Sequence, residues 1–181
     1  MTEEEIFDLM GNMPGRWFES AMDLLKGSAE LSEHAVTQAE KSGIPFTRSF
    51  WPRIMLRAFA LECLFKAHYL LRGPDKLCQG GKYVGVVKNE RHDLALLAKS
   101  ASVTISDAEE QLLDRLSAVA VSVGRYPIAK SANFPKRIKN GERLRLEWSS
   151  PRDEQIFKAL RDRLIAPFDP KGIYRRILKD A

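Results

Sequence analysis

The stretch over residues 56–72, LRAFALECLFKAHYLLR, constrains the fold of this chain more than any other segment. Apolar residues occupy nearly every position, so a helix formed here has no fully polar face. Pro52 suits the first turn of such a helix, and Gly73-Pro74 ends it. A helix that is apolar on nearly every side must be covered by its neighbours. We therefore predict that it forms the centre of a helical bundle.

Four further stretches have the apolar spacing of amphipathic helices and supply those neighbours. They are residues 16–41, 94–100, 106–123 and 151–166. Asp93 is placed to cap the second, and Ser106 with Glu109 has the spacing of a capping box for the third. Strand-like alternation is confined to the region around Asn140-Gly141, a dipeptide that favours a tight turn. The predicted fold is all-α, an up-and-down bundle of about five helices with a basic loop or small hairpin before the last helix.

A length of 181 residues suits one domain with extensions. The expected organisation is an N-terminal arm, a helical bundle, a basic loop or hairpin, and a C-terminal helix with a basic tail packed on the bundle. These parts cover residues 1–15, 16–125, 126–150 and 151–181. Within the bundle, residues 73–91 contain several glycines and lysines, which indicates a long, exposed connection.

Composition narrows the class of protein. Cys63 and Cys78 match no metal-binding spacing, and two cysteines make no disulfide framework. The acidic opening MTEEE is unlike a signal or transit peptide, and the longest apolar run is interrupted by charges before it reaches the length of a membrane span. We expect a soluble cytoplasmic protein that has no membrane contact, no cofactor and no metal.

Two charged residues stand out inside the apolar stretch. Glu62 and Lys66 lie one helical turn apart, with the acid on the N-terminal side, which is the favoured order for an ion pair. One interpretation is a structural ion pair that is partly buried where the bundle closes. The other is a polar patch beside a ligand pocket.

His92 precedes the capping Asp93 and is expected at the mouth of the bundle, partly solvated. There it could carry a proton near neutral pH, or it could fix the entry of the loop by packing and a hydrogen bond. His34 and His68 have no second ligand at a metal-binding spacing, so no metal site is predicted.

A glutamate and a lysine in an apolar helix, followed after a loop by His92-Asp93-Leu94 and a Leu/Ala run, resemble the HEPN (higher eukaryotes and prokaryotes nucleotide-binding) domain family. The resemblance covers roughly residues 16–125 and implies a helical bundle that pairs as a homodimer. The apolar connector at residues 44–46 and the surplus apolar surface of residues 56–72 are consistent with pairing.

HEPN ribonucleases have an arginine about four to six residues before a histidine, and none of the three histidines here is preceded in this way. Arg57 is too far from His68, and Arg91 adjoins His92. A composite site of His92 and Arg125 remains open, because the helix that ends near Arg125 should pack beside the one that begins after His92. An arginine that stabilises a phosphorane and a histidine that moves a proton are what metal-independent RNA cleavage requires.

Basic residues gather between the helices predicted over residues 106–123 and 151–166, with Tyr126, Phe134 and Trp148 among them. Cations for phosphates and rings for unstacked bases are the ingredients of single-stranded nucleic-acid binding. An acidic partner protein would also suit such a segment. The basic residues are Arg125, Lys130, Lys136, Arg137, Lys139, Arg143 and Arg145.

Three functions follow from these observations. The first is a HEPN-like module that binds RNA or a nucleotide, in a defence or toxin–antitoxin system as the resemblance implies, without the usual ribonuclease motif. The second is a divergent metal-independent endoribonuclease that uses His92 and Arg125. The third is a bundle that binds a small molecule or acts as a scaffold and has no role with nucleic acid.

Overall fold

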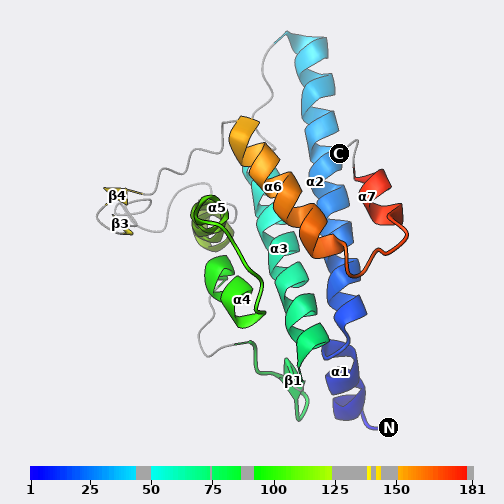
Figure 1. Ribbon diagram of the computed structural model, residues 1–181. Helices are drawn as coiled ribbons and strands as arrows, with labels where there is room; N and C mark the ends of the chain where they lie inside the picture. Colours follow the sequence, from blue (N-terminus) through cyan, green and yellow to red (C-terminus); the bar gives the residue numbers. More distant parts are fainter. Residues whose placement is uncertain are drawn as a thin grey trace.

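The computed structural model describes residues 1–43, 50–73, 75–86, 92–123, 138–139, 142–143 and 151–178. Within these residues the protein is almost entirely helical (Figure 1), and the predicted all-α bundle is confirmed. Its helices are α1 (Glu3–Gly11), α2 (Pro14–Ser42), α3 (Phe50–Arg72), α4 (Leu94–Ser100), α5 (Asp107–Ala118), the π-helical turn η1 (Val119–Val123), α6 (Pro151–Ile165) and α7 (Ile173–Ile177). Two short antiparallel hairpins pair β1 (Cys78–Gln79) with β2 (Lys82–Tyr83) and β3 (Ile138–Lys139) with β4 (Glu142–Arg143).

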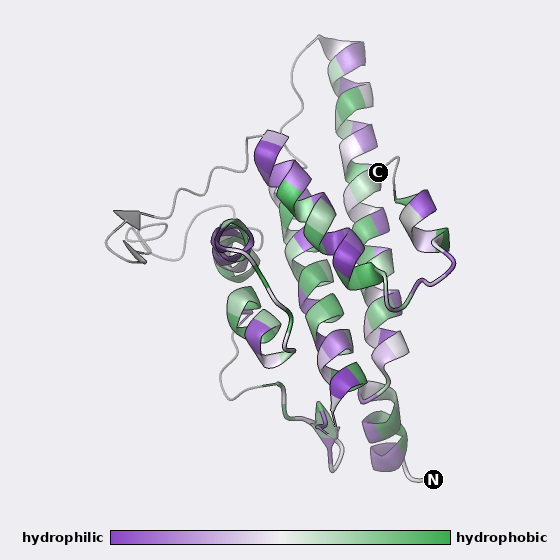
Figure 2. Ribbon diagram, viewed as in Figure 1, coloured by the Kyte–Doolittle hydropathy of each residue, from purple (hydrophilic) through white to green (hydrophobic). Residues whose placement is uncertain are grey.

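Helix α3 lies at the centre, as its composition predicts. Helix α2 runs along one side of it, α6 crosses it, and α4 and α5 cover the remaining side (Figure 1). Green, apolar residues of α3 lie among these neighbours in Figure 2. Much of the apolar surface of α3 is therefore buried inside the chain. The fully buried residues of α3 include Ile54, Ala58, Leu61, Leu64 and Phe65.

The helix ends follow the local signals in the sequence. The Asp93 carboxylate accepts a hydrogen bond from the Leu96 amide at 3.0 Å and so caps α4. Ser106 and Glu109 form the predicted capping box of α5. Gly43 ends α2 with a φ of 67°, a left-handed conformation that glycine adopts without a steric penalty. The paired strands β3 and β4 agree with the predicted hairpin, although Asn140 and Gly141 lie outside the described residues.

Most described residues of the connection after α3 are exposed, as predicted, but part of it is ordered against the protein. It contains the hairpin β1–β2, where Leu77 and Cys78 are buried. The Asn12 side chain accepts hydrogen bonds from the Leu77 and Cys78 amides at 2.7 and 3.0 Å and donates one to the Cys78 carbonyl at 2.7 Å. Two residues and a two-residue turn are too short to show strand periodicity, so the sequence pattern could not reveal this hairpin.

The protein has no described helix that is both long and apolar enough to cross a lipid bilayer.

Candidate functional site

The predicted ion pair on α3 forms, and His92 joins it. Lys66 Nζ donates to Glu62 Oε1 at 2.6 Å, and His92 Nδ1 lies 2.6 Å from Glu62 Oε2. The glutamate side chain is only 10% exposed and the lysine 5%, whereas the histidine is 31% exposed. Both carboxylate oxygens are thus engaged, and the cluster joins His92, which precedes the N-cap of α4, to the middle of α3.

Two aromatic rings cover the lysine. Lys66 Nζ lies 5.1 Å from the ring centroids of both Trp17 and Tyr83, within the range of cation–π attraction. Burial alone would lower the pKa of the Lys66 ammonium, but the charge and hydrogen bond of Glu62, with a contribution from Tyr83, raise this pKa above its ordinary value. Lys66 is therefore a permanent cation and cannot serve as a proton carrier near neutral pH.

His92 adopts a left-handed backbone conformation with a φ of 62°, which is uncommon for a residue other than glycine. Its ring packs at 5.6 Å from that of Phe59. A carboxylate can only accept hydrogen bonds, so His92 Nδ1 must carry the proton that Glu62 receives. A neutral His92 ring then has its acceptor at Nε2, the arrangement in which a carboxylate orients a histidine for proton transfer.

Of the predicted nucleic-acid and catalytic residues, Arg125, Lys130, Lys136, Arg137 and Arg145 lie outside the described residues. The backbone of Lys139 and Arg143 belongs to β3 and β4, where Lys139 pairs with Glu142 and Arg143 with Ile138. The composite site of His92 and Arg125 is therefore left as a prediction.

Next to Glu62 on α3 lies the Cys63 thiol, which is not a reactive nucleophile. Burial, and secondarily the negative charge of Glu62, raise the pKa of the Cys63 thiol to about 11, so it is not a thiolate at neutral pH. In the part of the chain that the structure describes, no group of three His, Cys, Asp or Glu side chains could hold a metal ion.

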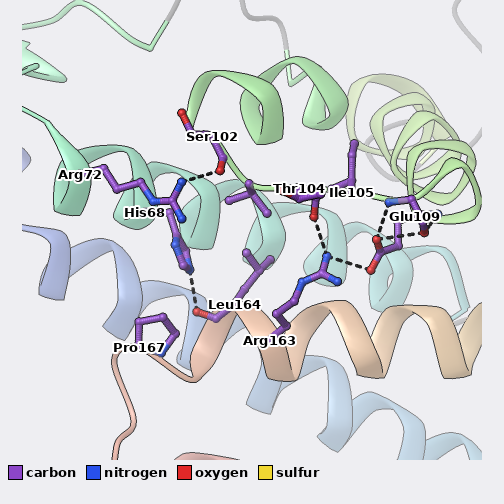
Figure 3. Close-up of a pocket in the computed structure, with 11 residues that line it drawn as sticks. His68, Arg72, Ser102, Thr104, Ile105, Glu109, Arg163, Leu164 and Pro167 are labelled. Carbon is purple, nitrogen blue, oxygen red and sulfur yellow. Dashed lines mark hydrogen bonds and ion pairs between the residues drawn. The ribbon is translucent and has the colours of Figure 1, made fainter.

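A cleft of about 630 Å³ lies on a different side of α3, where the α4–α5 loop meets α6 (Figure 3). Arg72 from α3 and Arg163 from α6 reach towards this loop. Arg72 donates to the Ser102 carbonyl, and Arg163 donates to the Thr104 carbonyl at 3.0 Å. Arg163 also pairs with Glu109 at 3.0 Å. These contacts hold the α4–α5 loop between the two helices.

Buried His68 forms part of the cleft wall and is a structural residue. Its Nε2 donates to the Leu164 carbonyl at 2.8 Å, which joins α3 to α6, and its ring meets Phe168 edge-on at 5.3 Å. Burial lowers the pKa of His68, with the Leu164 carbonyl opposing this effect and the Arg72 charge adding to it. The imidazole therefore stays neutral at physiological pH.

Sequence reasoning missed a second buried polar network. Both terminal nitrogens of Arg57 donate hydrogen bonds to the Glu154 carboxylate, at 2.6 and 3.1 Å. Its Nε donates a hydrogen bond to the Ser28 hydroxyl at 3.2 Å. The guanidinium also lies 4.8 Å from the Phe157 ring centroid. This contact joins α3 to α2 and α6 across 97 residues of sequence. The sequence indicated this network only by placing Arg57 among apolar residues of a helix. That position does not predict which residues the arginine contacts.

Comparisons of the chain with protein-family models, with curated proteins and with solved structures give no match.

Proposed function

We propose that this chain is a HEPN-like helical module that binds RNA or a nucleotide in a defence or toxin–antitoxin system. The observation that carries the proposal is that the positive charge of the chain is concentrated in one segment. Residues 125–147 hold seven Lys and Arg against two Glu, a net charge of +5, which equals the formal net charge of the whole chain. The remainder is therefore neutral in sum, and the attraction for a polyanion comes from one segment.

The two ends of this basic segment leave from helices that are bound to each other. Arg115 on α5 pairs with Asp153 in the first turn of α6 at 2.6 Å. The two helices that flank the segment are therefore held together on one bundle. Tyr126 and Phe134 in this segment and Trp148 just after it add rings on which unstacked bases can stack.

The meeting of Glu62, Lys66 and His92 supports the HEPN-like part of the proposal, because these residues carry the resemblance. Both oxygens of the buried glutamate receive donors from within the chain. A cluster satisfied in this way favours the structural interpretation of the ion pair over that of a polar patch that awaits a ligand.

Neutralising Lys136, Arg137 and Lys139 together with glutamine should weaken RNA binding and reduce its dependence on salt. Each phosphate contact contributes roughly 0.7 to 0.9 to the slope of log K against log salt concentration, so the slope should fall by about two to three. Fluorescence anisotropy with labelled single-stranded RNA over a salt series measures both quantities.

The matched control replaces the exposed Lys26, Lys41 and Lys76, which lie outside the basic segment, with glutamine. This variant has the same net charge as the first, so a general charge effect would alter both equally. Equal slopes for the two variants, or a wild-type protein that retains no RNA at low salt, would contradict the proposal.

A second candidate function is cleavage of RNA without a metal ion, which the contact between Glu62 Oε2 and His92 Nδ1 favours. The Glu62 carboxylate orients the His92 ring by accepting the hydrogen bond of Nδ1, so a neutral ring has its proton acceptor at Nε2. In this hypothesis His92 Nε2 takes the proton of the attacking 2′-hydroxyl, whose oxygen bonds to phosphorus as the 5′-oxygen leaves and gains a proton from water. Arg125 would neutralise the phosphorane.

Under this second hypothesis, His92→Ala and Arg125→Ala should each lower the rate of RNA cleavage in EDTA by about 10²- to 10⁴-fold. His34→Ala on the outer part of α2 is the control and should leave the rate unchanged. The assay follows labelled RNA from about pH 5 to about pH 9, because acid–base catalysis depends on pH. Wild-type protein that leaves the RNA intact throughout would exclude the enzyme and leave the binding function.

A further inference from the structure

The cleft between α6 and the α4–α5 loop has the size and the lining of a small-molecule site. Its volume of about 630 Å³ lies within the range that such sites occupy in proteins. Its lining residues come from α3, the α4–α5 loop, α5, α6 and the turn after α6, and none belongs to the basic segment 125–147. A ligand in this cleft would therefore have a role separate from the RNA binding proposed above.

The loop that forms one wall of the cleft is held in a fixed shape. The Val103 amide donates to the Ala98 carbonyl at 2.9 Å, which is the longer-range hydrogen bond of a Schellman motif at the end of α4. Ser102 supplies the left-handed residue of this motif, with a φ of 53°. The capping box of Ser106 and Glu109 fixes the other end of the loop at the start of α5. This wall therefore forms without help from a ligand.

Two arginines at the cleft keep hydrogen-bond donors that the described residues do not use. A guanidinium group has five N–H donors. Arg72 directs one nitrogen to the Ser102 carbonyl, and Arg163 directs one to the Thr104 carbonyl and Glu109 (Figure 3). Each guanidinium is thus oriented by the protein, while its remaining nitrogens stay open to a ligand. Paired N–H donors of this kind bind carboxylate and phosphate groups in a two-pronged manner.

The charges of the lining favour a ligand with a single negative charge. Arg163 pairs with Glu109 at 3.0 Å, whereas no described carboxylate pairs with Arg72. Burial keeps His68 neutral, so the charged lining residues sum to +1. A carboxylate balances this charge. A phosphate group, which carries close to two negative charges, exceeds it and is repelled by Glu109.

The rest of the lining suits an apolar body and offers it one buried acceptor. Val103, Ile105, Leu164 and Pro167 supply apolar surface. His68 donates from Nε2 to the Leu164 carbonyl, so the Nδ1 atom of its neutral ring is an acceptor. The histidine is only 6% exposed, and no described residue donates to Nδ1. Buried polar atoms in proteins are seldom left without a partner, so this acceptor is independent support for a ligand in the cleft.

We propose that this cleft binds a small organic monocarboxylate. Arg72 is the principal anchor of the carboxylate, because it is the cation of the lining that has no acidic partner. The apolar body of the ligand lies against the side chains of Val103, Ile105 and Leu164. Both recognition elements are needed, since an exposed arginine binds a bare anion weakly in competition with water and salt.

Titration of the full chain with sodium benzoate, followed by NMR of its ¹⁵N-labelled amides at about pH 7, tests this site. The Val103 and Ile105 amides and the Arg72 Nε–H should shift and saturate with a dissociation constant in roughly the millimolar range, as expected for a ligand of this size. Benzamide has the same shape without the charge, and acetate has the charge without the apolar body. Each should bind at least about tenfold more weakly than benzoate.

Arg72→Gln should weaken benzoate binding about tenfold or more, because it removes the charge that anchors the carboxylate. Arg16→Gln is the matched control, since it removes an exposed arginine of α2 that pairs with Glu19, and it should leave the affinity unchanged. Arg72→Lys keeps the charge without the fork of donors and should give an intermediate affinity. The amide spectrum of each variant also reports whether it is folded.

Several results would overturn the proposal. Wild-type protein that shows no saturable shift up to about 20 mM benzoate has no such site. Benzamide that binds as tightly as benzoate, or Arg72→Gln that binds benzoate as the wild type does, excludes Arg72 as the anchor. Inorganic phosphate that shifts the same amides at lower concentration than benzoate assigns the cleft to phosphate instead. The benzoate and benzamide comparison uses only wild-type protein, so it decides the matter even if a variant does not fold. RNA binding is measured separately, so its failure would not affect this test.

Discussion

Replacing Lys66 with methionine should lower the free energy of unfolding by about 3 kcal/mol. Methionine keeps much of the apolar stem but removes the cation, which leaves the buried Glu62 carboxylate with His92 as its remaining partner. An uncompensated charge in a site that is only 10% exposed costs far more than a lost surface contact. Loss of the attraction between the ammonium and the rings of Trp17 and Tyr83 adds to the effect.

Urea denaturation of wild type and variant measures this difference. Lys99→Met is the control, because Lys99 also pairs with a glutamate, at 2.9 Å, but its side chain is 62% exposed. It should cost less than about 1 kcal/mol. Equal losses for the two lysine variants would show that the Glu62 cluster is solvated.

Arg57→Met should destabilise the protein by a similar amount, about 3 kcal/mol, which for a chain of this length lowers the melting temperature by roughly 10 °C. The substitution removes the two-pronged contact with Glu154 and leaves the Ser28 hydroxyl buried. Lys158→Met is the matched control, because Lys158 approaches the same Glu154 carboxylate only at 3.9 Å from an exposed position. Its effect should stay below about 0.5 kcal/mol.

The contact between Arg57 and Glu154 also predicts how the stability of the protein depends on pH. Burial acts to raise the pKa of Glu154, but the hydrogen bonds and charge of Arg57 outweigh it and hold that pKa below its ordinary value. A carboxyl group with a lowered pKa stabilises the fold above its unfolded value of about 4.3, and this contribution is lost as the pH falls through the folded value. The stability difference between wild type and Arg57→Met should therefore shrink below about pH 4. A constant difference down to pH 2 would contradict the pairing.

Much of the secondary structure was predictable because its signals are local. A cap, a helix-ending glycine and an apolar repeat act within one or two turns, so Asp93, Ser106 and Gly43 mark helix ends in the sequence as they do in the structure. The central place of α3 followed from its composition, since no helix can expose so much apolar surface to water. The pair of Glu62 and Lys66 followed from a spacing of one turn.

The contacts that depend on distant residues were not predictable. Glu62 meets His92 across 30 positions and Arg57 meets Glu154 across 97, and no local pattern links either pair. The aromatic cover of Lys66 comes from Trp17 on α2 and Tyr83 in a hairpin that is too short to have a period.

By itself, therefore, the sequence determined an all-α bundle, the ends of its main helices, and the concentration of positive charge in residues 125–147. Tertiary structure alone decided which polar groups distant in the sequence meet in the interior and which side of α1 faces the solvent. The physical reason is that helix formation depends on neighbours along the chain, whereas a buried charge must find its partner wherever packing brings one. Asp8 of α1 and the capping Asn12 accept hydrogen bonds from amides of the hairpin and its start, so the polar side of α1 faces the protein.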